Sequence, residues 1–155
     1  MERTKRPLLL AGLILIIIAM VYFTVYSGLS LFFLDLLFAF ARDNGGTVDA
    51  SGTLVTILVI AMLAVSISAI VFSAIGIKRI SLPTNEFNAK KGAITVSLVL
   101  SLTIFFVAVW MLFSSFYIPN LIANVCLAIG VILLIVGLHK HKKAISQTKT
   151  ETNIE

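Results

Sequence analysis

Four long apolar runs restrict this chain to a helical fold inside a membrane. They extend over residues 8–26, 54–77, 93–116 and 121–138. Each run is close to the roughly 20 residues that an α-helix needs to cross a hydrocarbon core of about 30 Å. With 59% apolar and 12% charged residues, the chain is also far more apolar than a soluble domain. We therefore predict an all-α integral membrane protein with four transmembrane helices in two antiparallel hairpins.

The positions of the basic residues predict the orientation of the chain. Of the twelve Lys and Arg residues, all except Arg42 lie before the first run, between the second and third runs, or after the fourth. Lys and Arg next to a span are retained on the cytoplasmic side. We therefore expect the N-terminus (1–7), the loop at 78–92 and the tail (139–155) to be cytoplasmic, and the protein to be a multi-pass protein of the cell membrane.

The net charge of +5 needs no nucleic acid as a partner, because orientation accounts for it. Basic residues beside a membrane are also attracted to anionic headgroups, so the lipid bilayer itself is an expected partner. The tail at 139–155 carries too little apolar surface to form a folded unit, and we expect it to remain a polar extension.

The outer segment at 27–53 joins an apolar stretch to a short polar loop. A continuous helix from Leu8 to Ala41 would be about 51 Å long, which exceeds the roughly 40–45 Å of a whole bilayer. We therefore expect the first helix to break at Gly28. Residues 29–41 are too few to cross again, which predicts a short non-spanning helix on the outer side.

Asp35, Arg42 and Asn124 are the candidate functional polar residues. Asp35 and Arg42 are seven residues apart and would share one side of a helix. Asp35 is either a cation or proton site, or an interfacial carboxylate weakly paired with Arg42, and the short segment favours the interfacial position. Asn124 lies about one turn inside the last span, where it needs a partner, and a structural hydrogen bond is the favoured interpretation.

Small residues recur at helical spacing in the last three spans. Such residues let helices approach closely in a membrane, where apolar side chains gain nothing from leaving lipid. A polar path lined by serines is the alternative, but a serine in a membrane helix commonly bonds to its own backbone. The predicted helix-packing residues are Ser66, Ala69, Ser73, Gly76, Ser97, Ser101, Gly130 and Gly137.

Patterns typical of a catalytic, metal or cofactor site are missing from the sequence. It contains no Walker loop, no HExxH and no GxSxG. The single cysteine, Cys126, excludes an internal disulfide. His139 and His141 lack a third ligand in the sequence pattern and are typical of a solvated basic cluster. We therefore expect neither an enzyme nor a protein with a metal or a cofactor.

Basic junctions follow each predicted hairpin, at Ile77-Lys78-Arg79 and at Lys142-Lys143. With these junctions, a basic start and a polar tail, the chain resembles small uncharacterised four-helix membrane proteins of Gram-positive bacteria. The resemblance covers the whole chain and implies a topology but no activity. Small multidrug transporters are similar in having four short helices, but they carry an acid in the first span, and residues 8–26 contain none. Claudin-like proteins are similar in topology, but the first external loop here has no tryptophan and no cysteine pair.

These observations favour a small polytopic protein that contacts another membrane protein, or a second copy of itself, through helix faces or its external segment. Its role would be regulatory, accessory or of the immunity type. The alternative is a small oligomeric transporter or channel for a cation or small molecule that uses Asp35, Asn124 and the serine faces. A transporter needs polar groups along a shared path, whereas this chain is richer in small residues suited to contacts.

Overall fold

The fold is taken from a computed structural model, which describes residues 6–45, 50–114 and 118–152. In this part of the chain the secondary structure is helical, without strands. The helices are α1 (Pro7–Asp43), α2 (Ala50–Ile80), α3 (Thr84–Lys90), α4 (Gly92–Ser114) and α5 (Ile118–Thr152). Four of them, α1, α2, α4 and α5, are long and apolar enough to cross a membrane. The predicted all-α fold with four such helices is therefore confirmed.

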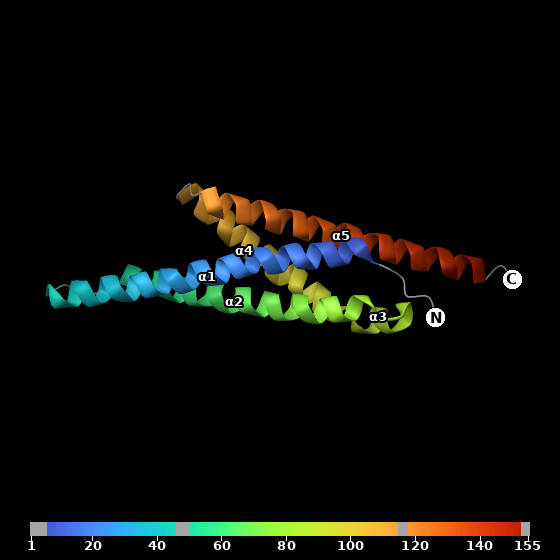
Figure 1. The fold of residues 1–155 in the computed structure, drawn as a ribbon, viewed down its shortest axis with the longest axis horizontal. Coiled ribbons are helices and arrows are strands. Elements are labelled where there is room, and N and C mark those ends of the chain that lie inside the picture. Colours follow the sequence, from blue (N-terminus) through green and yellow to red (C-terminus); the bar gives the residue numbers. More distant parts are fainter. Residues whose placement is uncertain (1–5, 46–49, 115–117, 153–155) are drawn as a thin grey trace.

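The long helices form two hairpins that pack against each other (Figure 1). α1 contacts both α2 and α5, and α4 contacts the same two helices from the other side. The α1–α2 hairpin continues well past the point where α4 connects to α5 (Figure 1). The bundle is therefore four helices thick over one part of its length and only two over the rest.

The core lies where the four long helices meet. In α1 the buried side chains begin at Leu9 and end at Ser27, which leaves the last four turns of this helix without a buried residue. Fully buried apolar side chains of the other helices complete the same cluster, among them Ala69, Ile94, Leu127 and Leu134.

The prediction of a separate outer helix at residues 29–41 is wrong, because α1 continues without a break to Asp43. A single glycine in a helix costs only about 1 kcal/mol relative to alanine, so Gly28 alone does not end α1. The Ser30 hydroxyl donates a hydrogen bond to the Tyr26 carbonyl at 2.8 Å, which bridges the Gly28 position. The start of α2 lies beside this part of α1, and residues of both helices line one hollow there.

The two segments expected to be irregular also contain helix. The loop at 78–92 holds the last turn of α2 and all of α3. The tail at 139–155 was expected not to fold, but α5 continues to Thr152. Extending an existing helix avoids the cost of nucleation, and no glycine or proline follows Gly137 to end it.

Candidate functional site

The serines predicted at helix contacts lie inside the bundle. Ser66, Ser73, Ser97 and Ser101 are all fully buried. The hydroxyls of Ser73 and Ser97 are 2.7 Å apart and join α2 to α4. Ser66 donates to the Met62 carbonyl at 2.8 Å, and Ser101 donates to the Ser97 carbonyl at 2.7 Å. Because each hydroxyl is paired within the protein, this arrangement suits packing better than a water-filled path.

Glycines bring the backbones of α1 and α5 into contact. A Cβ added to Gly12 would lie 2.9 Å from the Gly130 carbonyl oxygen, and one added to Gly130 would lie 3.1 Å from that of Gly12. About two turns further along α5, a Cβ on Gly137 would lie 2.7 Å from Leu9 Cδ2. A Cβ added to Gly76 would similarly lie 3.0 Å from Leu13 Cδ1. The sequence pattern did not identify Gly12, because spacing within one helix does not show which residue of another helix it meets.

Asn124 is buried near the start of α5, but among the described residues its side chain forms a hydrogen bond only within its own helix. Its amide nitrogen donates to the Asn120 carbonyl at 2.9 Å. The link between helices comes instead from the Tyr22 hydroxyl of α1, which donates to Asn120 Oδ1 at 2.6 Å. In the described part of the chain, Asn124 Oδ1 is buried without a hydrogen-bond partner. Asn124 thus lies in the packed interior of the bundle and does not line a transport path.

Asp35 and Arg42 line one hollow between α1 and α2, with a volume of about 390 Å³ and with Thr53 and Thr56 on its other wall. Both charged side chains are exposed. Within the described residues, no ion pair joins Asp35 to Arg42. Asp35 lies about 40 Å along the helix axis from Leu8, at 1.5 Å for each residue. An exposed carboxylate so far along α1 fits an interfacial position better than a buried cation site.

The opposite end of the bundle contains a polar cluster that sequence reasoning missed. We define the basic end as the end where Arg6, α3, the end of α2 and residues 139–142 of α5 lie. Arg6 is only 8% exposed, and its Nη1 donates to the carbonyl oxygens of Ile80 at 2.7 Å and Leu82 at 3.1 Å. Carbonyls at a helix C-terminus carry partial negative charge, so the guanidinium caps α2.

Phe87 of α3 connects Arg6 to α5. Its ring is fully buried, and the guanidinium carbon of Arg6 lies 4.0 Å from the ring centroid, in cation–π contact. The His141 ring meets Phe87 edge-on at 4.8 Å between centroids, and His141 Nε2 lies 3.2 Å from Asn88 Oδ1. Burial lowers the pKa of the Arg6 guanidinium from its ordinary value, because desolvation disfavours the charged form. An arginine nevertheless keeps its charge in proteins.

The sequence does contain a hint of this cluster, because the mostly polar connection includes the large apolar residues Ile80, Leu82 and Phe87. Sequence alone did not show that Arg6, 74 positions before Ile80, would lie against them. The cluster therefore joins α1, α2, α3 and α5 at a place where the sequence predicted only orientation.

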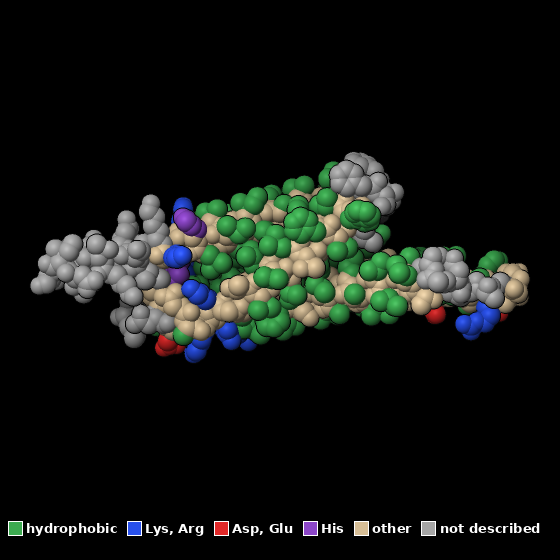
Figure 2. Space-filling view, turned by 180° about the vertical axis from the view of Figure 1, so that it is seen from behind, with side chains coloured by type: hydrophobic (Ala, Val, Ile, Leu, Met, Phe, Trp, Pro, Cys, Tyr) green, Lys and Arg blue, Asp and Glu red, His purple; other side chains and the backbone are tan. Residues whose placement is uncertain are grey.

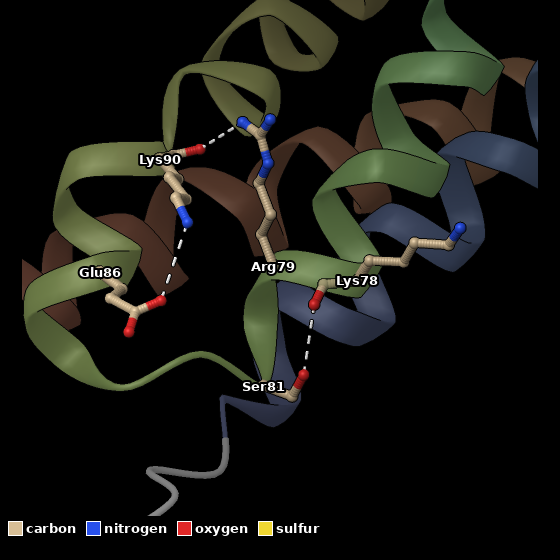
Figure 3. Close-up of polar contacts among 5 residues, drawn as sticks. All are labelled: Lys78, Arg79, Ser81, Glu86 and Lys90. Atoms are coloured by element: carbon tan, nitrogen blue, oxygen red, sulfur yellow. Dashed lines mark hydrogen bonds and ion pairs between the residues drawn. The ribbon is translucent and has the colours of Figure 1, made fainter.

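The connection between α2 and α3 is held by further polar contacts (Figure 3). Arg79 Nη1 donates to the Lys90 carbonyl at 2.7 Å, and Lys90 Nζ lies 3.8 Å from a Glu86 carboxylate oxygen. The Ser81 hydroxyl donates to the Lys78 carbonyl at 3.2 Å. Glu86 is the one acidic side chain among the described residues of the basic end, so this end keeps a strong positive charge.

The described residues contain no group of three His, Cys, Asp or Glu side chains placed to hold a metal ion. In comparisons with known proteins, no family model, no curated protein and no solved structure matches this chain.

Proposed function

We propose that this chain is a non-catalytic polytopic protein of the cell membrane that binds another membrane protein through the outer part of its α1–α2 hairpin. The outer hairpin is defined as residues 28–43 of α1 and 50–60 of α2. In this proposal the basic end and both termini face the cytoplasm, since Lys and Arg beside spans remain on that side. The outer hairpin then lies on the opposite side.

The length of α1 is the observation that carries the proposal. Its 37 residues extend about 55 Å, compared with a hydrocarbon core of about 30 Å. With Leu8 at the inner edge of the core, an upright helix leaves the core near Gly28. At a tilt of about 40°, which is the upper end of the usual range, Asp35 still lies about 31 Å from Leu8 along the membrane normal. Most of the outer hairpin is therefore at or beyond the outer headgroups.

The outer hairpin carries large apolar side chains that the rest of the chain leaves uncovered. On α1, Phe32, Leu37 and Phe40 are 64%, 62% and 70% exposed, and on α2, Leu54 and Ile57 are 60% and 61% exposed. Figure 2 shows apolar side chains continuing along this hairpin beyond the four-helix part. Outside the hydrocarbon core, burying one such side chain gains about 1.5–3 kcal/mol. Large apolar side chains exposed outside the hydrocarbon core are typical of a protein contact site.

The bundle interior supports a contact function over transport. The hydroxyls of Ser66, Ser73, Ser97 and Ser101 bond to one another or to their own helices. Among the described residues, the buried Ser27 hydroxyl of α1 has no hydrogen-bond partner. The largely apolar groove of about 410 Å³ between α2 and α4 is bordered by residues such as Val59, Ile104 and Trp110. A path for a cation would need polar groups facing a shared cavity.

Site-specific photo-crosslinking in intact cells tests the proposal. A photoreactive amino acid at Leu37 should form an adduct with a second protein, because this position lies on the uncovered outer hairpin. The matched control is Ile18, which is 56% exposed on the same helix but lies in the middle of the core, facing lipid. We expect a protein adduct from Leu37 and none from Ile18.

The mass of the adduct identifies the kind of partner. An adduct of twice the mass of this chain would assign the outer hairpin to a second copy, and any other mass would assign it to a different protein. If Leu37 gives no protein adduct, or the same adducts as Ile18, the proposed contact surface is refuted.

A further inference from the structure

A groove between α3, α4 and α5 opens at the basic end, with a volume of about 540 Å³. α4 and α5 lie closest where α4 ends and α5 begins, and they diverge towards this end (Figure 1). The groove has an apolar part and a polar rim. Leu98, Ile135 and Leu138 form the apolar part, and the rim consists of Asn88, Lys91, Thr95, His139, His141 and Lys142.

The rim carries positive charge that no described acid neutralises. Lys91 and Lys142 are both exposed, and neither forms an ion pair with a described residue. The acid of this end, Glu86, is paired with Lys90 instead, at 3.8 Å. α4 begins at Gly92, directly after Lys91, so the positive end of its helix dipole adds to the same region. Figure 2 shows the basic and histidine side chains gathered at this end beside apolar ones.

The two parts of the groove match in their chemistry the change from hydrocarbon to headgroup in a membrane. Leu98 is two turns into α4 from Lys91, and Ile135 is about two turns before Lys142 in α5. An acyl chain that lies against Leu98 and Ile135 would place its phosphate near the two lysines. Lysine binds phosphate as a point charge, and basic pockets between helices at a membrane surface suit anionic headgroups.

We propose that this groove is a binding site for one anionic phospholipid, with the phosphate between Lys91 and Lys142 and an acyl chain against Leu98 and Ile135. A free phosphate ion would use the basic rim but not the apolar part. The site does not depend on which protein the outer hairpin binds, because the two lie at opposite ends of the molecule (Figure 1).

The test measures binding of fluorescent phosphatidylglycerol to the purified protein in neutral detergent, with phosphatidylcholine of the same chains as the reference lipid. The groove variant is Lys91→Gln with Lys142→Gln. The control variant is Lys78→Gln with Lys90→Gln, which removes the same charge from the same end outside the groove. A lysine near an anionic headgroup contributes about fivefold in affinity, so the groove variant should lose about 25-fold for phosphatidylglycerol. We expect a loss of less than about fivefold for the control.

Two further arms separate the lipid from other anions and from general surface charge. The variant Ile135→Trp fills the apolar part while keeping both lysines, and it should weaken phosphatidylglycerol binding without changing the binding of inorganic phosphate. Competition by inorganic phosphate at equal concentration would instead assign the rim to a free anion and overturn the lipid site. Equal losses in the groove and control variants would overturn it too, since surface charge alone would then explain the binding. Unchanged thermal unfolding of each variant confirms that the protein remains folded.

Discussion

Arg6 has the most structural contacts of the charged side chains described at the basic end. It caps the carbonyls at the end of α2, lies on the ring of Phe87 and reaches towards Thr84, 3.5 Å from its hydroxyl. A charged side chain this buried is tolerated because carbonyl oxygens and an aromatic face replace its water. A residue that the sequence identified only by its charge thus joins the start of α1 to the end of α2 and to α3.

Replacing Arg6 with glutamine should destabilise the bundle. The change removes charge-assisted hydrogen bonds to two carbonyls and the contact with Phe87, and we expect a loss of about 1.5–3 kcal/mol in the free energy of unfolding. Thermal unfolding in mild detergent would measure it. Lys78→Gln is the control, because it removes one exposed positive charge from the same end and should change stability by less than about 0.5 kcal/mol. Equal melting temperatures for the two variants would contradict the capping role of Arg6.

At the scale of the helices, two glycines of α1 have opposite environments. Gly12 lies against the backbone of α5, where a Cβ would meet the Gly130 carbonyl oxygen at 2.9 Å. Gly28 has no atom within 4 Å of its Cβ position. The first glycine therefore permits close packing of two helices, whereas the second only lowers the helix propensity of α1.

Alanine at each of these glycines should therefore change stability in opposite directions. Gly12→Ala forces α1 away from α5 and should cost about 1–3 kcal/mol, since backbone atoms yield less than a flexible side chain. Gly28→Ala should gain up to about 1 kcal/mol from helix propensity. Unfolding of both variants under the same detergent conditions provides the measurement. If Gly12→Ala were as stable as Gly28→Ala, α1 and α5 would not be in backbone contact.

At the scale of the whole molecule, charge and apolar surface are separated along its length. Basic side chains collect at one end, and exposed apolar side chains of the outer hairpin continue towards the other (Figure 2). Seven positive side chains belong to the described basic end, compared with Arg42 on the outer hairpin. By the positive-inside rule, this asymmetry predicts that the basic end faces the cytoplasm.

Cysteine labelling tests that orientation. Single cysteines replace Asn44, at the tip of the outer hairpin, and Asn85, in α3, each in a Cys126→Ser background. An impermeant thiol reagent applied to intact cells should label position 44 and leave position 85 unlabelled, because the basic end is expected inside. Permeabilised cells should be labelled at both positions, which shows that both thiols are reactive. Labelling of position 85 alone in intact cells would invert the orientation.

The four apolar helices could be predicted from the sequence, because their length and composition leave few alternatives to crossing a membrane. Its small-residue spacing also marked one face of α2, and the structure buries Ser66, Ala69 and Ser73 on that face. Three other features are seen only in the folded chain. α1 continues through Gly28, Gly12 lies against Gly130, and Arg6 lies against Phe87. For Gly12 and Arg6 the energy depends on atoms of a helix distant in the chain, whereas spacing within one helix reveals a face but not what packs against it.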